Sequence, residues 1–164
     1  MIKSLRGTIR GLTAGAMTSV LLTAGIGVAY AHAFHGAAAT KSHYGAIFQI
    51  DAGGNKIIKK TLNNIENLLQ DQRLKGKVTV ELIANSKGFD VYVKGNGFQG
   101  KLRRLQKQGV ILAQCANTLR ELHVDRHDLY PFIHVVPSGV GEITIREAEG
   151  WAYIHPSTPN PNQF

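Results

Sequence analysis

The sequence predicts an α/β fold, a doubly wound three-layer domain built around a mainly parallel five-stranded sheet. Two observations lead to this fold class. Five apolar runs alternate with stretches of helical spacing, in the order β-α-β-α-β-α-β-α-β. The apolar runs are continuous rather than alternating, which is typical of strands whose sheet is covered by helices on both faces. The pattern occupies residues 44–156 and fits one domain.

Residues 44–50 (YGAIFQI) read as the first buried strand, and the Asp-Ala-Gly-Gly run after them is typical of a turn. Asn55 is placed to cap a helix, which we expect to end at Gly76. The apolar face of this helix comprises Ile57, Ile58, Leu62, Ile65, Leu68 and Leu69. Residues 78–84 (VTVELIA) are β-branched and apolar, and they predict the second strand.

The middle of the chain is less regular. Residues 85–97 are punctuated by glycines, and residues 89–94 (FDVYVK) fit an extended or a helical segment equally well. Phe98, Leu102 and Leu105 then share one helical face. The basic residues of this segment read as a solvated outer face, and residues 110–114 (VILAQ) predict the third strand.

A short helix is expected near residues 119–122, with Thr118 as its N-cap and Glu121 reaching back to it. Residues 132–136 (FIHVV) predict the fourth strand. A Pro-Ser-Gly turn leads into a last helix, which Gly150 closes, and residues 151–154 (WAYI) predict the fifth strand. The inward face of the last helix is expected to hold Val140, Ile143 and Ala148. Trp151 and Tyr153 are expected to be core or subunit contacts.

The N-terminus has the features of a secretory signal peptide, residues 1–33. Lys3, Arg6 and Arg10 form a basic start, and residues 12–28 are apolar or small apart from four hydroxyl residues. Overlapping small-x-small motifs predict cleavage after Ala31 or Ala33 and a periplasmic or secreted protein. A retained membrane anchor is the alternative, because the apolar stretch approaches the length of a bilayer span. Residues 34–43 read as a linker, and the proline-rich residues 157–164 as a disordered tail.

The charge of the chain is mildly basic. Its net charge falls from +8 to +5 once the three basic residues of the signal peptide are removed. No interleaving of arginine and aromatic residues accompanies this charge, so a nucleic-acid partner is not predicted. No stable membrane span is expected after cleavage.

Cys115 is the only cysteine in the chain, so no internal disulfide can form. A lone thiol in an exported protein is reactive, forms an intermolecular bond or is buried and inert. Cys115 follows the third strand, and ligands of open parallel sheets gather at the carboxyl ends of strands. We therefore expect an accessible thiol just before a helix N-terminus, where a thiolate is favoured. The alternative is a buried cysteine that fills space as a small hydrophobe.

Three stretches resemble the DsrE/DsrF-like family of small sulfur-relay proteins. They are Cys115 with Asn117-Thr118-Leu119, Pro137-Ser138-Gly139, and the run GWAYI at residues 150–154. The resemblance implies a doubly wound parallel fold, a homo-oligomer, and a cysteine that carries sulfur as a persulfide. It assigns that role to Cys115, with Asn117 and Thr118 as binding residues, and implies a sulfur donor or acceptor protein as partner.

The expected function is therefore sulfur handling by an exported protein through one reactive cysteine, by persulfide carriage or thiol transfer, as a sulfurtransferase or sulfur carrier without a cofactor. The alternative is a non-catalytic small-molecule-binding or assembly module in which Cys115 is structural. A Cys/His hydrolase is disfavoured because no histidine or acid close in sequence identifies a base. His123 and His127 have the spacing of helical metal ligands, but Asp125 between them reads as a new cap, so no metal site is predicted.

Overall fold

A computed structural model describes residues 34 and 36–157 of the chain. The chain divides into two units, Met1–Gly36 and Ala37–Phe164, and the account below concerns the second. The expected signal peptide, residues 1–33, and all but the first residue of the expected tail lie outside the described residues. In the described part of the chain, every helix is too short or too polar to cross a membrane.

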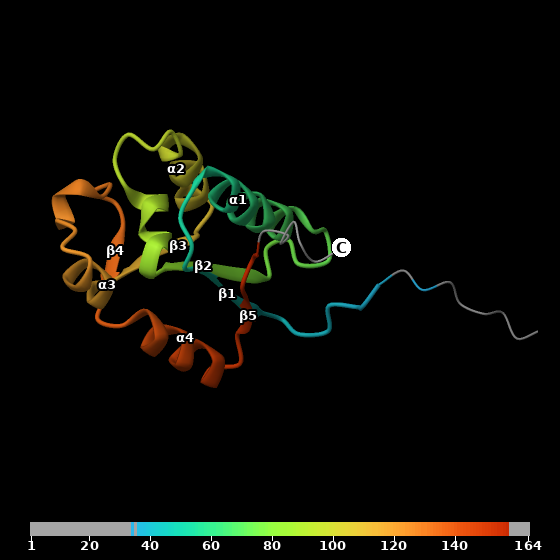
Figure 1. Cartoon of the computed structure of the whole chain (residues 1–164). Coiled ribbons are helices and arrows are strands. Elements are labelled where there is room, and N and C mark those ends of the chain that lie inside the picture. The colour runs from blue at the N-terminus through green and yellow to red at the C-terminus, as the bar shows by residue number, and fades with distance from the viewer. Residues whose placement is uncertain (1–33, 35, 158–164) are drawn as a thin grey trace, which may run out of the picture. The chain divides into compact units, whose positions relative to one another are not determined.

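Five parallel strands form one sheet in the order β4-β3-β2-β1-β5. The strands are β1 (Tyr44–Ile50), β2 (Val78–Ala84), β3 (Ile111–Cys115), β4 (His134–Val136) and β5 (Ala152–Ile154). The predicted α/β class with a parallel five-stranded sheet is confirmed. The first four strands advance across the sheet in one direction, and the connection from β4 to β5 returns across the whole sheet (Figure 1).

The direction of these steps decides which face each helix covers. The α-helices are α1 (Asn55–Gln70), α2 (Gln99–Lys107), α3 (Ala116–Glu121) and α4 (Gly139–Ala148), and the 3₁₀ helices are η1 (Ser86–Tyr92) and η2 (Arg126–Asp128). Parallel crossovers are right-handed, so reversing the direction of travel moves a helix to the other face. Accordingly, α1 and α2 lie on one side of the sheet and α4 lies on the other (Figure 1).

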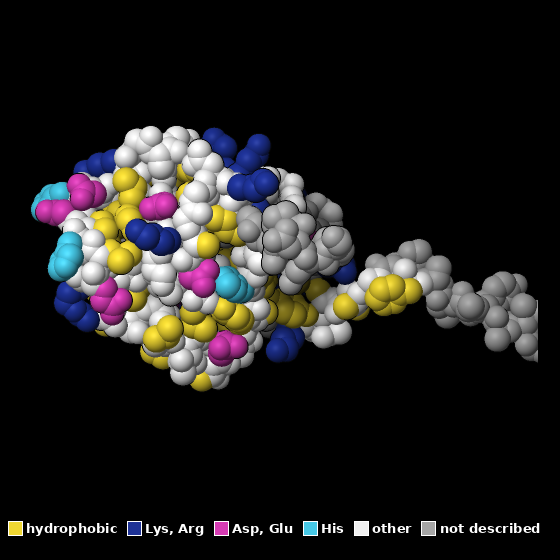
Figure 2. Space-filling model, in the orientation of Figure 1, with side chains coloured by type: hydrophobic (Ala, Val, Ile, Leu, Met, Phe, Trp, Pro, Cys, Tyr) yellow, Lys and Arg dark blue, Asp and Glu magenta, His cyan; other side chains and the backbone are white. Residues whose placement is uncertain are grey.

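The two faces of the sheet are buried to different extents. On the side of α1 and α2, a large core brings together residues from β1, β2, β3 and both helices. On the side of α4, the buried cluster has three members, Ile47, Ile83 and Ala113, with Val136, Ile143 and Trp151 packed partly against it. Figure 2 shows the difference at the surface: hydrophobic side chains emerge over α4, while Lys and Arg gather over α1 and α2. Helix α4 is therefore held by little apolar burial.

Helix α1 begins and ends differently from the expectation. Gly54 is its N-cap, with φ of 98°, and the side chain of Asn55 makes no capping bond. The helix ends at Gln70 rather than Gly76, because the Asp71 carboxylate accepts hydrogen bonds from the backbone N–H of Arg73 (2.9 Å) and from its Nε (3.0 Å). Such a local bond from side chain to backbone competes with helix continuation.

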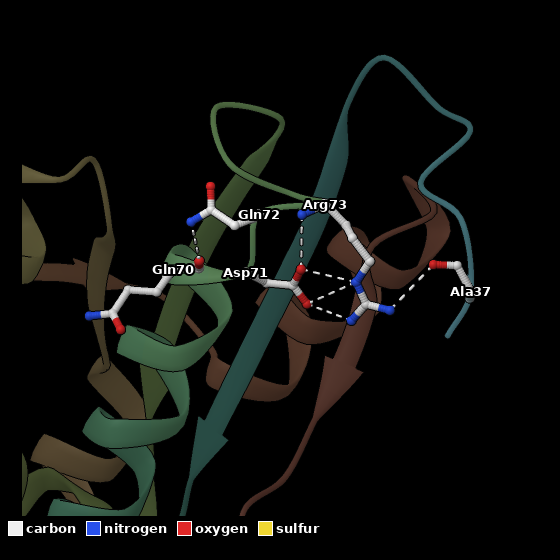
Figure 3. A network of polar contacts seen from close by, with 5 residues as sticks. All are labelled: Ala37, Gln70, Asp71, Gln72 and Arg73. Atoms are coloured by element: carbon white, nitrogen blue, oxygen red, sulfur yellow. Dashed lines mark hydrogen bonds and ion pairs between the residues drawn. The ribbon is translucent and has the colours of Figure 1, made fainter. Parts of the chain in front are cut away.

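The same contact fixes the start of the folded unit. The Arg73 guanidinium also donates to the carbonyl oxygen of Ala37 at 3.3 Å, as Figure 3 shows. The side-chain and backbone hydrogen bonds from Arg73 lower the pKa of Asp71 to about 2. Part of the expected linker, residues 34–43, is thereby tied to the domain.

Other expectations from the sequence need correction. Val140 is 64% exposed and Ala148 is exposed, so neither faces inward from α4; only Ile143 packs against the sheet. Strand β4 begins at His134, two residues later than predicted, and Phe132 packs against the larger core instead. The undecided segment at residues 89–94 continues the 3₁₀ helix η1 as far as Tyr92.

The closeness of η1 to strand β1 gives a stability prediction. A Cβ added at Gly88 would lie 1.9 Å from the carbonyl oxygen of Ile50, which also accepts the backbone N–H of Asn85. Gly88→Ala is expected to lower the free energy of unfolding by ~1–3 kcal/mol because backbone must move to make room. Urea denaturation followed by circular dichroism measures the loss.

The matched control is Gly100→Ala in helix α2, where the nearest atom to an added Cβ is 3.8 Å away. This change is expected to leave stability unchanged or to raise it by up to ~1 kcal/mol. Equal stability of the two variants would contradict the close packing of η1 on β1.

Candidate functional site

Cys115 lies where the chain leaves the sheet in two opposite directions. It is the last residue of β3 and pairs with Val136, the last residue of β4. The chain continues from β3 into α3, whose Leu119 packs against the larger core, and from β4 into α4, whose Ile143 packs against the smaller cluster. Adjacent parallel strands whose exits diverge in this way open the crevice in which open α/β sheets bind ligands. The predicted location of Cys115 at the carboxyl end of the sheet is confirmed.

The helix after the thiol begins earlier than predicted. Cys115 is itself the N-cap of α3, and the helix starts at Ala116 instead of after Thr118. Thr118 lies in the first turn and is buried, while Glu121 is the last helical residue, so the expected capping box is wrong. The pattern Thr-x-x-Glu predicts the wrong helix start because β3 runs into α3 without a connecting loop.

Donor groups surround the sulfur of Cys115. Burial raises the pKa of the Cys115 thiol, but backbone N–H groups of Thr118, Gly139 and Asn117 and the hydroxyl of Thr118 lower it. These donors outweigh burial, and the pKa falls below its usual value of 9.0. The largest causes that lower the pKa are hydrogen bonds from uncharged groups, so the thiolate is stabilised mainly by an uncharged cradle.

The hydroxyl of Thr118 is oriented by a second strand of the sheet. Its Oγ1 accepts the backbone N–H of Ser86 at 2.9 Å. A hydroxyl that accepts in this way keeps its single proton for another acceptor, and this hydroxyl lowers the pKa of the Cys115 thiol. Ser86 follows β2 and has φ of 48°, in the left-handed region that non-glycine residues seldom adopt. The chain at the end of β2 thus orients the Thr118 hydroxyl, which serves Cys115 at the end of β3.

The N-terminus of α4 approaches the thiol because residue 139 is glycine. A Cβ added at Gly139 would lie 3.2 Å from the Cβ of Cys115 and 3.4 Å from that of Asn85. Ser138 caps the helix by accepting the N–H of Gly141 at 3.2 Å. The Pro-Ser-Gly turn after the fourth strand is the sequence signal for this helix start. No sequence pattern indicates the hydrogen bond from the backbone N–H of Ser86 to Thr118.

The expected accessibility of the thiol and the role of Asn117 need correction. Cys115 is 5% exposed, so the sulfur is sheltered in the crevice rather than open to solvent. The side chain of Asn117 accepts a hydrogen bond from the Arg120 guanidinium at 2.9 Å, which leaves only its backbone N–H at the thiol. The structure brings Cys115 and Thr118 into direct contact and places Asn117 beside them through its backbone.

A row of uncharged polar side chains continues from the crevice toward β5. Asn85, whose Cβ lies close to Gly139, accepts a hydrogen bond from the Gln49 amide at 2.9 Å. Gln49 in turn accepts from the Tyr153 hydroxyl. Tyr153 lies at the far end of this row, on β5, and is 41% exposed, so it is not a core residue.

The two histidines considered as metal ligands do not come together. His123 has φ of 54° after α3, and His127 lies in η2 with its ring 2.8 Å from the Asp125 carboxylate. Asp125 caps η2, as expected, by accepting the N–H of His127. Within residues 34 and 36–157, no group of three or more His, Cys, Asp or Glu side chains is arranged to hold a metal ion.

Comparison with known proteins finds relatives among the solved structures. No family model matches the chain, and neither does any curated protein. A solved protein of unknown function, MTH1491 from Methanobacterium thermoautotrophicum, is 37% identical, with a TM-score of 0.64. The match covers 69% of this chain and 99% of that one. The chain belongs to the family of MTH1491. Because MTH1491 is titled as a protein of unknown function, this membership supports the fold and leaves the chemistry to the site itself.

The role of the Thr118 hydroxyl is testable through the pKa of the thiol. Thr118→Val removes the hydroxyl while keeping the shape, and should raise the pH midpoint of Cys115 alkylation by up to ~1 pH unit, because the thiolate loses a donor. Thr118→Ser keeps the hydroxyl and should retain the native midpoint. Iodoacetamide rates across pH measure this, with circular dichroism to verify folding. An unchanged midpoint in folded Thr118→Val would contradict the role of the hydroxyl.

Proposed function

We propose that this protein is exported and carries sulfur on Cys115 as a persulfide. The observation that supports this most directly is the meeting of two helix starts at one cysteine: Cys115 is the N-cap of α3, and Gly139 at the start of α4 packs against it. A cradle of this kind stabilises an anion, and both a thiolate and a persulfide are anions. The resemblance of the residues around Cys115 and Gly139 to the DsrE/DsrF-like family agrees with this chemistry.

The transfer requires two displacements and no redox partner. The Cys115 thiolate attacks the outer sulfur of a donor persulfide, R–S–SH, and forms a new bond from its Sγ to that sulfur. The S–S bond of the donor breaks, and its electron pair leaves with the donor as the thiolate R–S⁻. An acceptor thiolate then attacks the outer sulfur in the same way, which regenerates the Cys115 thiolate. Sulfur moves as a neutral atom, so electrons balance at each step.

The shelter around Cys115 fits a carrier. A residue that is 5% exposed keeps most water and oxidants away from a labile persulfide. The uncharged cradle lowers the thiol pKa without an ion pair, so the sulfur remains a good leaving group and a good nucleophile in turn. The donor or acceptor is a persulfide or thiol that presents a small sulfur group to the crevice.

Sulfur loading gives the direct test. Purified protein incubated with a small persulfide donor is expected to gain the mass of one sulfur, which dithiothreitol removes. Cys115→Ser should abolish the gain, because it removes the only thiol in the chain. Mass spectrometry of the intact protein reads out both. Folded native protein that takes up no sulfur at any donor concentration would refute the carrier function.

The second candidate is a non-catalytic module in which Cys115 is structural. Its supporting observation is the same low exposure, together with the tight approach of Gly139 to the Cβ of Cys115. In that case the thiol resists iodoacetamide until the protein unfolds, and Cys115→Ala behaves as a simple loss of packing. Alkylation of the native protein separates the two functions.

We also propose that the protein is a homo-oligomer. Val140 and Ile145 on α4 are 64% and 56% exposed, and such apolar side chains are typical of surfaces that pair with another chain. Light scattering under reducing conditions should give a mass above that of one chain. Val140→Lys combined with Ile145→Lys should lower the mass to that of a monomer; a native monomer at tens of micromolar would exclude the assembly.

A further inference from the structure

Helix α4 supplies a donor to the thiol, yet few buried side chains hold it. Gly139 is its only buried residue, and Ile143 is its only side chain packed against the small apolar cluster of that face. A helix usually keeps its place through a continuous apolar stripe, which α4 does not have. Its position on the sheet must therefore depend on another contact.

That contact is an ion pair between α4 and the middle of β2. The Nε of Arg146 donates to Oε2 of Glu81 at 2.8 Å, and Glu81 is 1% exposed. The guanidinium carbon of Arg146 also lies 4.4 Å from the centre of the Trp151 ring. A planar guanidinium held at once by a carboxylate and an aromatic face has little freedom to shift.

The carboxylates around Arg146 are not equivalent. Glu142 and Glu149 of α4 also reach Arg146, each at 3.2 Å, but Glu149 lies at the surface with about half of its side chain exposed. Burial raises the pKa of Glu81 despite the hydrogen bond from Arg146, and the charges of Glu142 and Glu149 raise it further. Breaking a buried ion pair leaves one buried charge without a partner. Glu81 and Arg146 therefore resist separation far more than the exposed pair of Glu149 and Arg146 does.

Both ends of α4 contact the same strand, β2. Gly139 lies against Ile83 and Asn85 at the carboxyl end of β2, and Arg146 reaches Glu81 farther back along it. The seven steps from Gly139 to Arg146 advance ~10 Å along the helix. The four steps from Glu81 to Asn85 advance ~13 Å along the strand, so the two lengths are comparable. Helix α4 thus runs antiparallel to β2 with one contact point near each end.

We propose that the Glu81–Arg146 pair is a positioning device for Cys115, fixing α4 so that its N-terminus at Gly139 stays packed against the thiol. This inference rests on the proposed function, in which the ionised thiol is the reacting group. Glu81 and Arg146 touch neither the sulfur nor a substrate, so they act through the helix. Losing the pair frees α4 to slide or rotate, and the sulfur then loses one of its donors.

The test compares two substitutions at the same guanidinium. Glu81→Gln removes the buried charge, and Glu149→Gln removes the exposed one as a matched control. Glu81→Gln should raise the pH midpoint of Cys115 alkylation by roughly half to one pH unit. Glu149→Gln should leave the midpoint unchanged. In NMR spectra, the amide signal of Gly139 should shift in Glu81→Gln, while that of Thr118 keeps its position.

A folded Glu81→Gln protein with the native midpoint and the native Gly139 signal overturns the inference. If Glu81→Gln does not fold, Arg146→Lys decides, because it keeps a cation beside Glu81 but loses the Nε donor and the planar contact with Trp151. A raised midpoint in Arg146→Lys supports the positioning role, and a native midpoint overturns it.

Sulfur loading separates the two proposals. Native protein that takes up no sulfur refutes the carrier function, yet the alkylation midpoint still reports whether Glu81 positions α4. Native protein that takes up sulfur, with variants whose midpoints do not move, leaves the carrier function standing and refutes the positioning role.

Discussion

The reversal of the chain after β4 is the constraint on which the site depends. Right-handed crossovers place the helices of the first strands on one face, so the long return to β5 must place α4 on the other. Neighbouring strands then send their exits apart at Cys115 and Val136. The gap between those exits is filled by two helix starts, one beginning at Ala116 and one at Gly139. The donors on the thiol follow from topology rather than from any local motif.

The groups around Cys115 stabilise its thiolate only moderately. Each helix terminus or neutral hydrogen bond contributes about 1 kcal/mol or less, and burial of the sulfur opposes them. One pKa unit corresponds to about 1.4 kcal/mol, so several donors are needed to bring the thiol toward neutral pH. Because no single donor dominates, the precise position of each helix start matters. That is why a pair as remote as Glu81 and Arg146 can influence the thiol.

The order of elements and the location of Cys115 could be predicted from the sequence, because continuous apolar strands and helical spacing are strong local signals. The details of the site could not. Thr118 looked like a cap because its neighbours fit a capping box, whereas strand β3 leads straight into the helix and makes Cys115 the cap. The bond from Ser86 to Thr118 joins residues 32 positions apart, and no local pattern encodes it. Val140 was placed inward because the spacing of α4 does not reveal how thinly its face is covered.

The hydrogen bond from Arg73 to the carbonyl oxygen of Ala37 bears on where the protein can be labelled or immobilised. The chain enters the domain beside this bond and reaches β1 at Tyr44, at the amino end of the sheet. All five strands run the same way, so Cys115 lies at the other end of the sheet, a strand length of ~17–20 Å away. Residues beyond β5 leave from the end that carries the thiol, where Pro156 is already buried. Immobilisation at the Ala37 side therefore leaves the crevice free, whereas an attachment directly after Ile154 shares the end of the sheet that holds the thiol.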